Sequence, residues 1–434
     1  MGGNSAIGTS PRSFLFLQGP IGPFFSRLAQ RLAADGHAVH RINFHGGDRL
    51  FWRLAGAVDF RGGAAEWPAF LCELLGRRCI TDLVLFGDCR PMHRVALAAA
   101  AERKLPAHVF EEGYLRPNWI TLERGGVNGN SLLPHDPQYY RESVRSAPRR
   151  GETPVASSFV RRAFEDVLYH TAMAVTRHYY RGYRTHRPWH PYVDYAHAAG
   201  RFLHRPLVKR RTVARCERLA ARPQHYFVFP LQLDADTQIR HHSVFRRMQP
   251  AIEHVIASFA RHAPGDALLS VTEHPLETGV AGLKLIVDRC AADFGVHSRV
   301  VYFEGGTPDR LLRGSRGVIT VNSTIGLRAL SWGLPVTTLG QAVYALPGLT
   351  FQGTVDEFWR HAAPPDPILF AAFRRVLVVR TQINGGFYSA SGISMAVREA
   401  ASRLQQEPAL GQSVREQPAR LDPDLLLPPT AAAL

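Results

Sequence analysis

The sequence is poor in cysteine and in lysine. Its five cysteines are scattered along the chain and include no CxxC pair. An odd, scattered set argues against a disulfide framework and against a zinc site, and it favours reduced thiols. Lysine occurs only at Lys104, Lys209 and Lys284, so arginine carries almost all of the net charge of +16.

Long apolar runs and several catalytic motifs are also missing. No apolar run reaches the ~18 residues of a membrane-spanning helix, and the first residues lack the charged start and apolar centre of a signal peptide. We therefore expect a soluble protein that stays in the cytosol. The sequence contains no Walker A, Ser-x-x-Lys, GxSxG or HExxH motif, which argues against kinases and hydrolases. A NAD site is disfavoured because Pro20 and Pro23 disrupt the expected glycine-rich loop.

Strand-like apolar runs and helical periodicities alternate along most of the chain. We predict an α/β fold with two Rossmann-like halves that face a cleft, as in GT-B glycosyltransferases, together with a basic helical insertion. Residues 121–133 are rich in Gly and Asn and are expected to form a loop. The expected domains are an N-terminal Rossmann-like domain (13–138), a basic and aromatic-rich helical linker or membrane-facing segment (139–222), a C-terminal nucleotide-sugar-binding domain (223–407) and a disordered tail (408–434).

One stretch, Tyr226 to Arg240, combines a buried-strand pattern with a very polar loop. The apolar run ends at Pro230, and a helical pattern follows the loop. Ligands of open α/β sheets bind beyond the carboxyl ends of strands, which makes this loop a candidate site. A solvated connection in which Asp234 caps a turn is the alternative. The polar residues of the loop are Gln232, Asp234, Asp236, Gln238 and Arg240, followed by His241 and His242.

Other polar residues also follow expected strands. Glu112 and Arg116 follow residues 107–110, and His274 follows residues 267–271. The residues Asn322, Ser323, Thr324 and Gly326 lie at a strand–helix junction. Such a junction suits a phosphate or a ribose, because it offers free N–H groups and hydroxyls. The alternatives are a surface ion pair for Glu112 and Arg116 and an ordinary N-cap at the junction.

The basic charge is concentrated in one segment. Residues 141–220 contain 17 Arg and Lys against 6 Asp and Glu, with Tyr and Trp interleaved. This composition suits an anionic membrane surface or single-stranded nucleic acid. A helical linker that packs its aromatic side chains on the rest of the protein is the third interpretation.

Several of these motifs together resemble the bacterial capsule polysaccharide biosynthesis/export family. They are Gln232-x-x-x-Asp236, His274-Pro275, Glu111-Glu112-Gly113-Tyr114-x-Arg116 and Asn322-Ser323-Thr324-x-Gly326. The opening around Gly19 and the run from Phe86 to Pro91 are similar to the KpsS/LipB branch. The resemblance implies a retaining β-Kdo transferase that takes 3-deoxy-D-manno-octulosonic acid (Kdo) from CMP-Kdo. Its acceptor would be a phosphatidylglycerol-type lipid, on which it starts the capsule linker for export.

The resemblance also assigns roles to residues. It implies that Asp236 is the nucleophile, that His274 contacts the donor phosphate or carboxylate, and that Glu112 lies near acceptor or donor. The expected donor-binding residues are Gln232, Arg240, Asn322, Ser323, Thr324, Gly326 and Arg116. We expect no metal to be required, although Asp234 and Asp236 could hold Mg²⁺ or Mn²⁺.

The resemblance further implies a cytoplasmic protein that is peripheral on the inner face of the inner membrane. Its expected partners are CMP-Kdo, an anionic phospholipid acceptor and other capsule assembly proteins. Two alternatives stay open. One is a non-catalytic export or assembly component with a transferase-like fold. The other is a basic nucleic-acid-binding protein, which is disfavoured because no recognisable nucleic-acid module is present.

Overall fold

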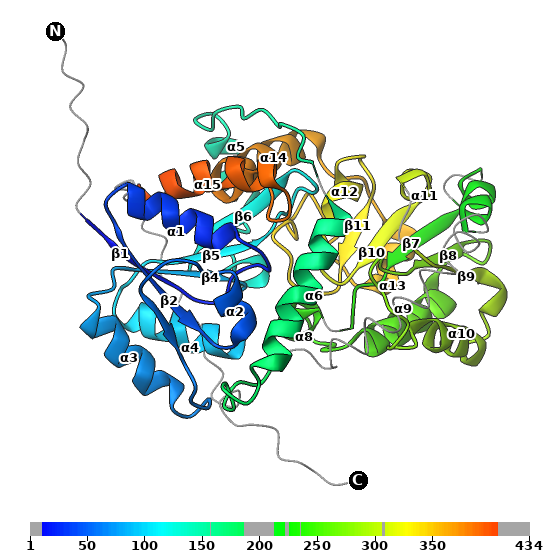
Figure 1. Ribbon diagram of the computed structural model, residues 1–434. Coiled ribbons are helices and arrows are strands. Elements are labelled where there is room, and N and C mark those ends of the chain that lie inside the picture. The colour runs from blue at the N-terminus through cyan, green and yellow to red at the C-terminus, as the bar shows by residue number, and fades with distance from the viewer. Residues whose placement is uncertain are drawn as a thin grey trace.

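The computed structural model describes residues 11–156, 158–185, 212–221, 225–234, 236–305 and 309–406. Figure 1 shows two α/β halves, each built around its own sheet. Both sheets have a buried apolar cluster on each face. This confirms the predicted α/β class with two Rossmann-like halves.

The N-terminal sheet has seven strands in the order β12-β6-β5-β4-β1-β2-β3. Its strands are β1 (Ser13–Phe16), β2 (Ala38–Asn43), β3 (Ala57–Asp59), β4 (Asp82–Phe86), β5 (Ala107–Glu112), β6 (Trp119–Arg124) and β12 (Gln382–Asn384). The first five strands are parallel, whereas β6 and β12 are antiparallel to their neighbours. The helices of this half are α1 (Phe24–Ala34), α2 (Gly46–Leu50), α3 (Trp67–Arg77) and α4 (Pro91–Glu102).

The prediction of a loop at residues 121–133 is wrong for its first residues, because β6 extends to Arg124. Every residue of β6 before Arg124 is buried, and its aromatic and β-branched side chains suit a strand. The Gly- and Asn-rich part begins at Gly125 and includes a 3₁₀ turn at Asn128–Asn130. The glycines therefore mark the turn that follows the strand and not the whole segment.

The C-terminal sheet has five parallel strands in the order β11-β10-β7-β8-β9. They are β7 (Tyr226–Pro230), β8 (Leu268–Thr272), β9 (Val300–Phe303), β10 (Gly317–Thr320) and β11 (Val336–Thr338). The helices are α8 (Thr237–His242), α9 (Met248–His262), α10 (Leu283–Asp293), α11 (Asp309–Arg313), α12 (Ile325–Leu330) and α13 (Val355–His361), with a 3₁₀ turn at His297–Arg299. Because β7 lies at the centre of this sheet, the polar loop that follows it lies at the middle of the sheet edge.

The end of the described chain returns to the N-terminal half. The predicted C-terminal boundary of the domain at residues 223–407 is therefore wrong. Helix α14 (Pro367–Thr381) leads into β12, which pairs with β6, and α15 (Ala390–Gln405) packs against α1 (Figure 1). The side chain of Gln382 accepts a hydrogen bond from the Tyr114 backbone N–H at 3.1 Å. This contact spans most of the chain and has no local sequence signal.

The predicted helical insertion contains α5 (Pro137–Ser143), α6 (Phe159–Val175) and a helix at residues 212–220. Helix α6 packs on α2, where a Cβ at Gly46 would lie 2.7 Å from the Ala172 carbonyl oxygen. Gly46 also donates its N–H to Thr176 Oγ1 at 3.0 Å. These contacts hold α6 on the N-terminal half. The expected tail at 408–434 lies outside the described residues.

Within the described ranges, no helix is long and apolar enough to cross a membrane.

Candidate active site

The polar loop after β7 is connected to the loop after β10 by a pair of side-chain amides. Gln232 Nε2 donates to Asn322 Oδ1 at 3.0 Å, and the Asn322 backbone N–H donates to Gln232 Oε1 at 3.2 Å. Both residues are buried, and Asn322 Nδ2 also donates to the Gln238 carbonyl at 2.9 Å. The structure thus brings the two predicted donor-binding residues together, in contacts that fix the loop.

Asp236 is held at the start of α8 by this arrangement. Its Oδ1 accepts the Gln238 backbone N–H at 2.9 Å, and Gln232 Nε2 lies 3.4 Å from its Oδ2. One carboxylate oxygen therefore serves as the helix N-cap, and the other is only weakly engaged. Asp234 has a separate capping role, because its Oδ1 accepts the Met248 backbone N–H at 2.9 Å at the start of α9.

His274 lies directly after β8 and shares a charged neighbourhood with Asp236 and Arg116. Burial lowers the pKa of His274, Asp236 raises it, and Arg116 lowers it further. His274 Nδ1 accepts the Leu276 backbone N–H at 3.1 Å, which leaves Nε2 as the protonated nitrogen of the neutral ring. Because Arg116 comes from the N-terminal half, residues of both halves contribute to the electrostatic environment of His274.

The last two residues of β5, Glu111 and Glu112, are adjacent carboxyl groups with different environments. Tyr388 donates its hydroxyl to Glu112 Oε1 at 2.7 Å, and the Glu112 backbone N–H donates to Glu111 Oε1 at 2.9 Å. Burial raises the pKa of Glu111 to about 7, and the nearby Glu112 and Asp88 add to this effect. Glu111 was not among the predicted site residues, although it belongs to the same motif as Glu112.

The residues of the strand–helix junction after β10 differ in the contacts that they make. Ser323 Oγ accepts the Ile325 backbone N–H at 3.3 Å, whereas the Thr324 side chain makes no capping bond. A Cβ at Gly326 would collide with the Tyr344 hydroxyl, which itself donates to the Ser323 carbonyl at 2.5 Å. Packing against Tyr344 therefore accounts for Gly326, and donor binding by Ser323 and Thr324 stays a prediction. Arg240 is exposed on α8.

The two halves also touch at three buried side chains. Cys89 Sγ lies 3.2 Å from Asp88 Oδ1 and 3.3 Å from His242 Nε2. The pKa of His242 is lowered by burial, whereas Asp88 and Asp236 both raise it. Asp88, Cys89 and His242 are the group among the described residues with ligand atoms close enough to hold a metal ion. Asp234 and Asp236 belong to no such group of three in that part of the chain.

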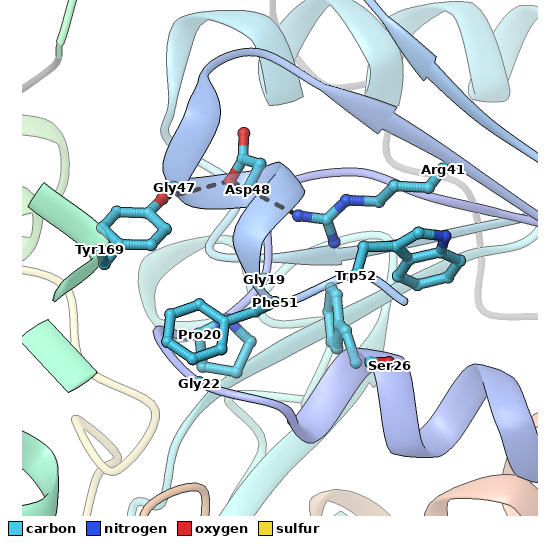
Figure 2. Close-up of a pocket in the computed structure, with 11 residues that line it drawn as sticks. Gly19, Pro20, Gly22, Ser26, Arg41, Gly47, Asp48, Phe51, Trp52 and Tyr169 are labelled. Carbon is cyan, nitrogen blue, oxygen red and sulfur yellow. Dashed lines mark hydrogen bonds and ion pairs between the residues drawn. The ribbon is translucent and has the colours of Figure 1, made fainter. Parts of the chain in front are cut away.

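A small pocket lies at the same edge of the N-terminal sheet (Figure 2). It contains a buried ion pair between Arg41 Nη2 and Asp48 Oδ1 at 3.4 Å, and Tyr169 of α6 donates its hydroxyl to the same oxygen at 3.2 Å. Its volume of about 10 Å³ is the space of one water molecule. This pocket is therefore too small to hold a nucleotide.

Known proteins with similar sequences point to one family. Residues 81–388, which include the site residues of both halves, match the family described as "Capsule polysaccharide biosynthesis protein". The chain is 34% identical to the capsule polysaccharide export protein KpsS of Escherichia coli. The alignment of 382 residues covers 87% of this chain and 97% of that protein. It is 36% identical over 398 residues to the capsule polysaccharide modification protein LipB of Neisseria meningitidis serogroup A, with coverages of 88% and 92%.

Solved structures with a similar arrangement are more distant. The β-Kdo 2,7 transferase KpsC of Thermosulfurimonas dismutans aligns over 91% of this chain and 98% of that chain, with 13% identity and a TM-score of 0.43. The sequence matches are sufficient for the family, and the predicted resemblance is confirmed. The chain belongs to the capsule polysaccharide biosynthesis protein family.

Proposed function

We propose that this protein is a glycosyltransferase that transfers Kdo from CMP-Kdo to a phosphatidylglycerol-type lipid and so starts the linker of an exported capsule. The observation that carries the proposal is the electrostatic influence on His274 of Asp236 from the C-terminal half and of Arg116 from the N-terminal half. Kdo has a carboxylate on its anomeric carbon, and its leaving group is a phosphate. A cation and an N–H donor beside the attacking carboxylate would offset the repulsion between these negative charges.

The proposed reaction has two displacements at the anomeric carbon. An oxygen of Asp236 attacks this carbon, the bond to the phosphate oxygen breaks, and CMP leaves with the bonding electron pair. The acceptor hydroxyl then attacks the same carbon while the bond to Asp236 breaks and its carboxylate is restored. Two displacements retain the configuration of the sugar.

The hydroxyl of the acceptor must lose its proton in the second step. Glu111 suits this task because a general base works best with a pKa near the operating pH, and burial raises the pKa of Glu111 to about 7. Glu112 is already engaged by the Tyr388 hydroxyl, so in this proposal it positions the loop beside the acceptor. We further propose that Arg240, Ser323 and Thr324 bind the phosphate of CMP.

The proposed location is the cytoplasmic face of the inner membrane, where an anionic lipid acceptor is available. Arg181 and Arg184 are exposed and could approach its headgroups, whereas the rest of the predicted basic segment through residue 211 lies outside the described residues. No divalent metal has a step in this reaction. Other capsule assembly proteins are proposed partners, and nucleic acid is not.

A non-catalytic role in export is the second candidate, because the Escherichia coli relative is named an export protein. Incubation of the purified chain with CMP-Kdo and a phosphatidylglycerol-type lipid, followed by mass spectrometry, separates the two. The transferase proposal predicts free CMP and a lipid heavier by Kdo. Intact donor and unmodified lipid under conditions where CMP-Kdo binds would favour the export role.

A further inference from the structure

Helix α6 has two opposite faces with different surroundings. One face lies on the N-terminal half, where Glu165 is buried, Tyr169 bonds to Asp48, and Thr176, just beyond the helix, accepts the Gly46 N–H. The opposite face exposes large apolar side chains at the spacing of a single helical stripe. These side chains, which we call the α6 apolar face, are Val160 (76% exposed), Phe164 (65%), Val167 (46%), Leu168 (38%) and Val175 (75%).

The α6 apolar face differs from the other exposed apolar residues of the described chain. Leu285 on α10 and Ile368 on α14 are about as exposed as Val160 and Val175. Each of them, however, is a single exposed large apolar residue within its own helix. Isolated residues of this kind are normal on protein surfaces, whereas a continuous apolar stripe marks an interaction site. Thr171, the remaining residue within the stripe, carries no charge.

Basic residues continue directly from the end of α6. Arg177, Arg181 and Arg184 are all exposed. A helix with an apolar stripe and neighbouring arginines suits the interface of an anionic lipid bilayer, where the stripe enters the acyl boundary and the guanidinium groups meet phosphates. We propose that the α6 apolar face docks the protein in the plane of an anionic lipid membrane.

The other side of α6 reaches the candidate active site. The guanidinium of Arg162 lies 4.2 Å from the centre of the Tyr388 ring, and Tyr388 donates its hydroxyl to Glu112. Figure 1 shows α6 between the two halves. Docking of α6 on lipid would therefore bring the membrane within one helix of Glu112 and of its partner Tyr388. This last step rests on the proposed function, whereas the docking itself does not.

Vesicle binding by the full chain tests the docking. The double variant Phe164→Asp/Val167→Asp should bind vesicles containing phosphatidylglycerol roughly tenfold or more weakly than the unmodified protein, because it places charge in the acyl boundary. The matched control is Leu285→Asp/Ile368→Asp, which changes two residues outside α6 that are at least as exposed as Phe164 and Val167. This control should bind vesicles as the unmodified protein does. Thermal melting of both variants should stay unchanged, because all four side chains are exposed.

Two results would overturn the docking proposal. One is equal vesicle binding by the α6 variant and its control. The other is a dimer of the unmodified protein that the α6 variant alone dissociates, since a second copy would then cover the face. Transfer to a short-chain, water-soluble phosphatidylglycerol should survive in the α6 variant. If the unmodified protein does not transfer Kdo at all, the proposed function fails while vesicle binding still decides the role of α6.

Discussion

Cys89 Sγ lies 3.3 Å from His242 Nε2, and this contact joins the loop after β4 in one half to the end of α8 in the other. The backbone at Gly129 also lies so close to the His242 ring that a Cβ there would collide with it. Asp236 is the N-cap of helix α8, which ends at His242. The position of the candidate nucleophile is therefore fixed partly by the N-terminal half.

Loss of the hydroxyls after β10 should weaken nucleotide binding. If Ser323 and Thr324 bind the phosphate, their double change to Ala removes donors worth about 0.5–1.5 kcal/mol each. The affinity for CMP, measured by calorimetry, should fall roughly tenfold or more. The melting temperature should change little, because Thr324 makes no capping bond and that of Ser323 is long, at 3.3 Å. Unchanged affinity for CMP would leave these residues as part of an ordinary helix start.

A chelator should leave transfer unaffected. Asp234 and Asp236 each cap a helix, and Arg116 and the neutral His274 offer another way to stabilise the donor charges. We therefore expect the same initial rate of CMP release with and without EDTA. Loss of activity that Mn²⁺ restores would contradict this expectation and would make Asp234 and Asp236 candidate metal ligands. Asp88→Asn would then test the buried group that contains Cys89 and His242.

The elevated pKa of Glu111 should appear in the pH dependence of stability. Burial raises this pKa from its ordinary value of 4.5 to about 7, so the folded protein binds the proton more tightly than the unfolded chain. The contribution favours the folded state below the ordinary pKa and is lost as the pH rises through about 7. Glu111→Gln cannot ionise, so its free energy of unfolding should decline less between acidic and neutral pH.

Denaturant unfolding over this pH range measures the difference. Glu123→Gln is a matched variant, because burial also raises the pKa of Glu123 to about 7 and this carboxyl lies between Tyr114 and Ser131. Both variants should flatten the decline of stability. Parallel curves for Glu111→Gln and the unmodified protein would contradict the elevated pKa of Glu111.

The arginines that follow α6 should contribute a salt-dependent part of membrane binding. Replacement of Arg181, Arg184 and Arg187 by Ala should cost about 1 kcal/mol each near an anionic surface. Of these, Arg181 and Arg184 are exposed, whereas Arg187 lies outside the described residues. Sedimentation with phosphatidylglycerol vesicles should weaken in the variant, and added salt should weaken the unmodified protein. Equal binding to neutral and anionic vesicles would contradict an electrostatic contribution.

The parts of the structure that depend on local patterns were predictable from the sequence. The buried strand at Tyr226–Pro230, the polar loop after it and the parallel α/β half around it follow from an apolar run, a proline and a helical periodicity. The positions of Asp236 and His274 after the ends of expected strands were predictable as well, and β7 and β8 prove to be neighbouring parallel strands whose ends share one edge.

The remaining features depend on contacts between distant residues. Strand β12 has three residues and pairs with β6 across more than half of the chain, so no local pattern could assign it to the N-terminal sheet. The elevated pKa of Glu111 arises from burial, which the adjacent pair Glu111 and Glu112 does not reveal. The spacing of Val160, Phe164, Val167, Leu168 and Val175 was visible in the sequence. Whether that stripe faces the core or solvent depends on the close packing of α6 against Gly46, which is a contact between distant residues.

In the proposed reaction, Asp236 is the residue that forms a bond to the sugar. Asp236→Asn keeps an oxygen that can accept the Gln238 N–H, so the fold and the binding of CMP-Kdo should persist. Transfer should be abolished, because an amide is a very poor nucleophile. His274→Gln is a useful companion variant, since it keeps an N–H donor and should slow transfer without abolishing the adduct.

Peptide mass spectrometry of the unmodified protein, quenched during reaction with CMP-Kdo, tests this claim directly. We predict a mass increase equal to Kdo, without the elements of water, on the peptide that contains Asp236, and none in the Asp236→Asn variant. An adduct on the peptide that contains Glu111 and Glu112, or full transfer by Asp236→Asn, would contradict the account.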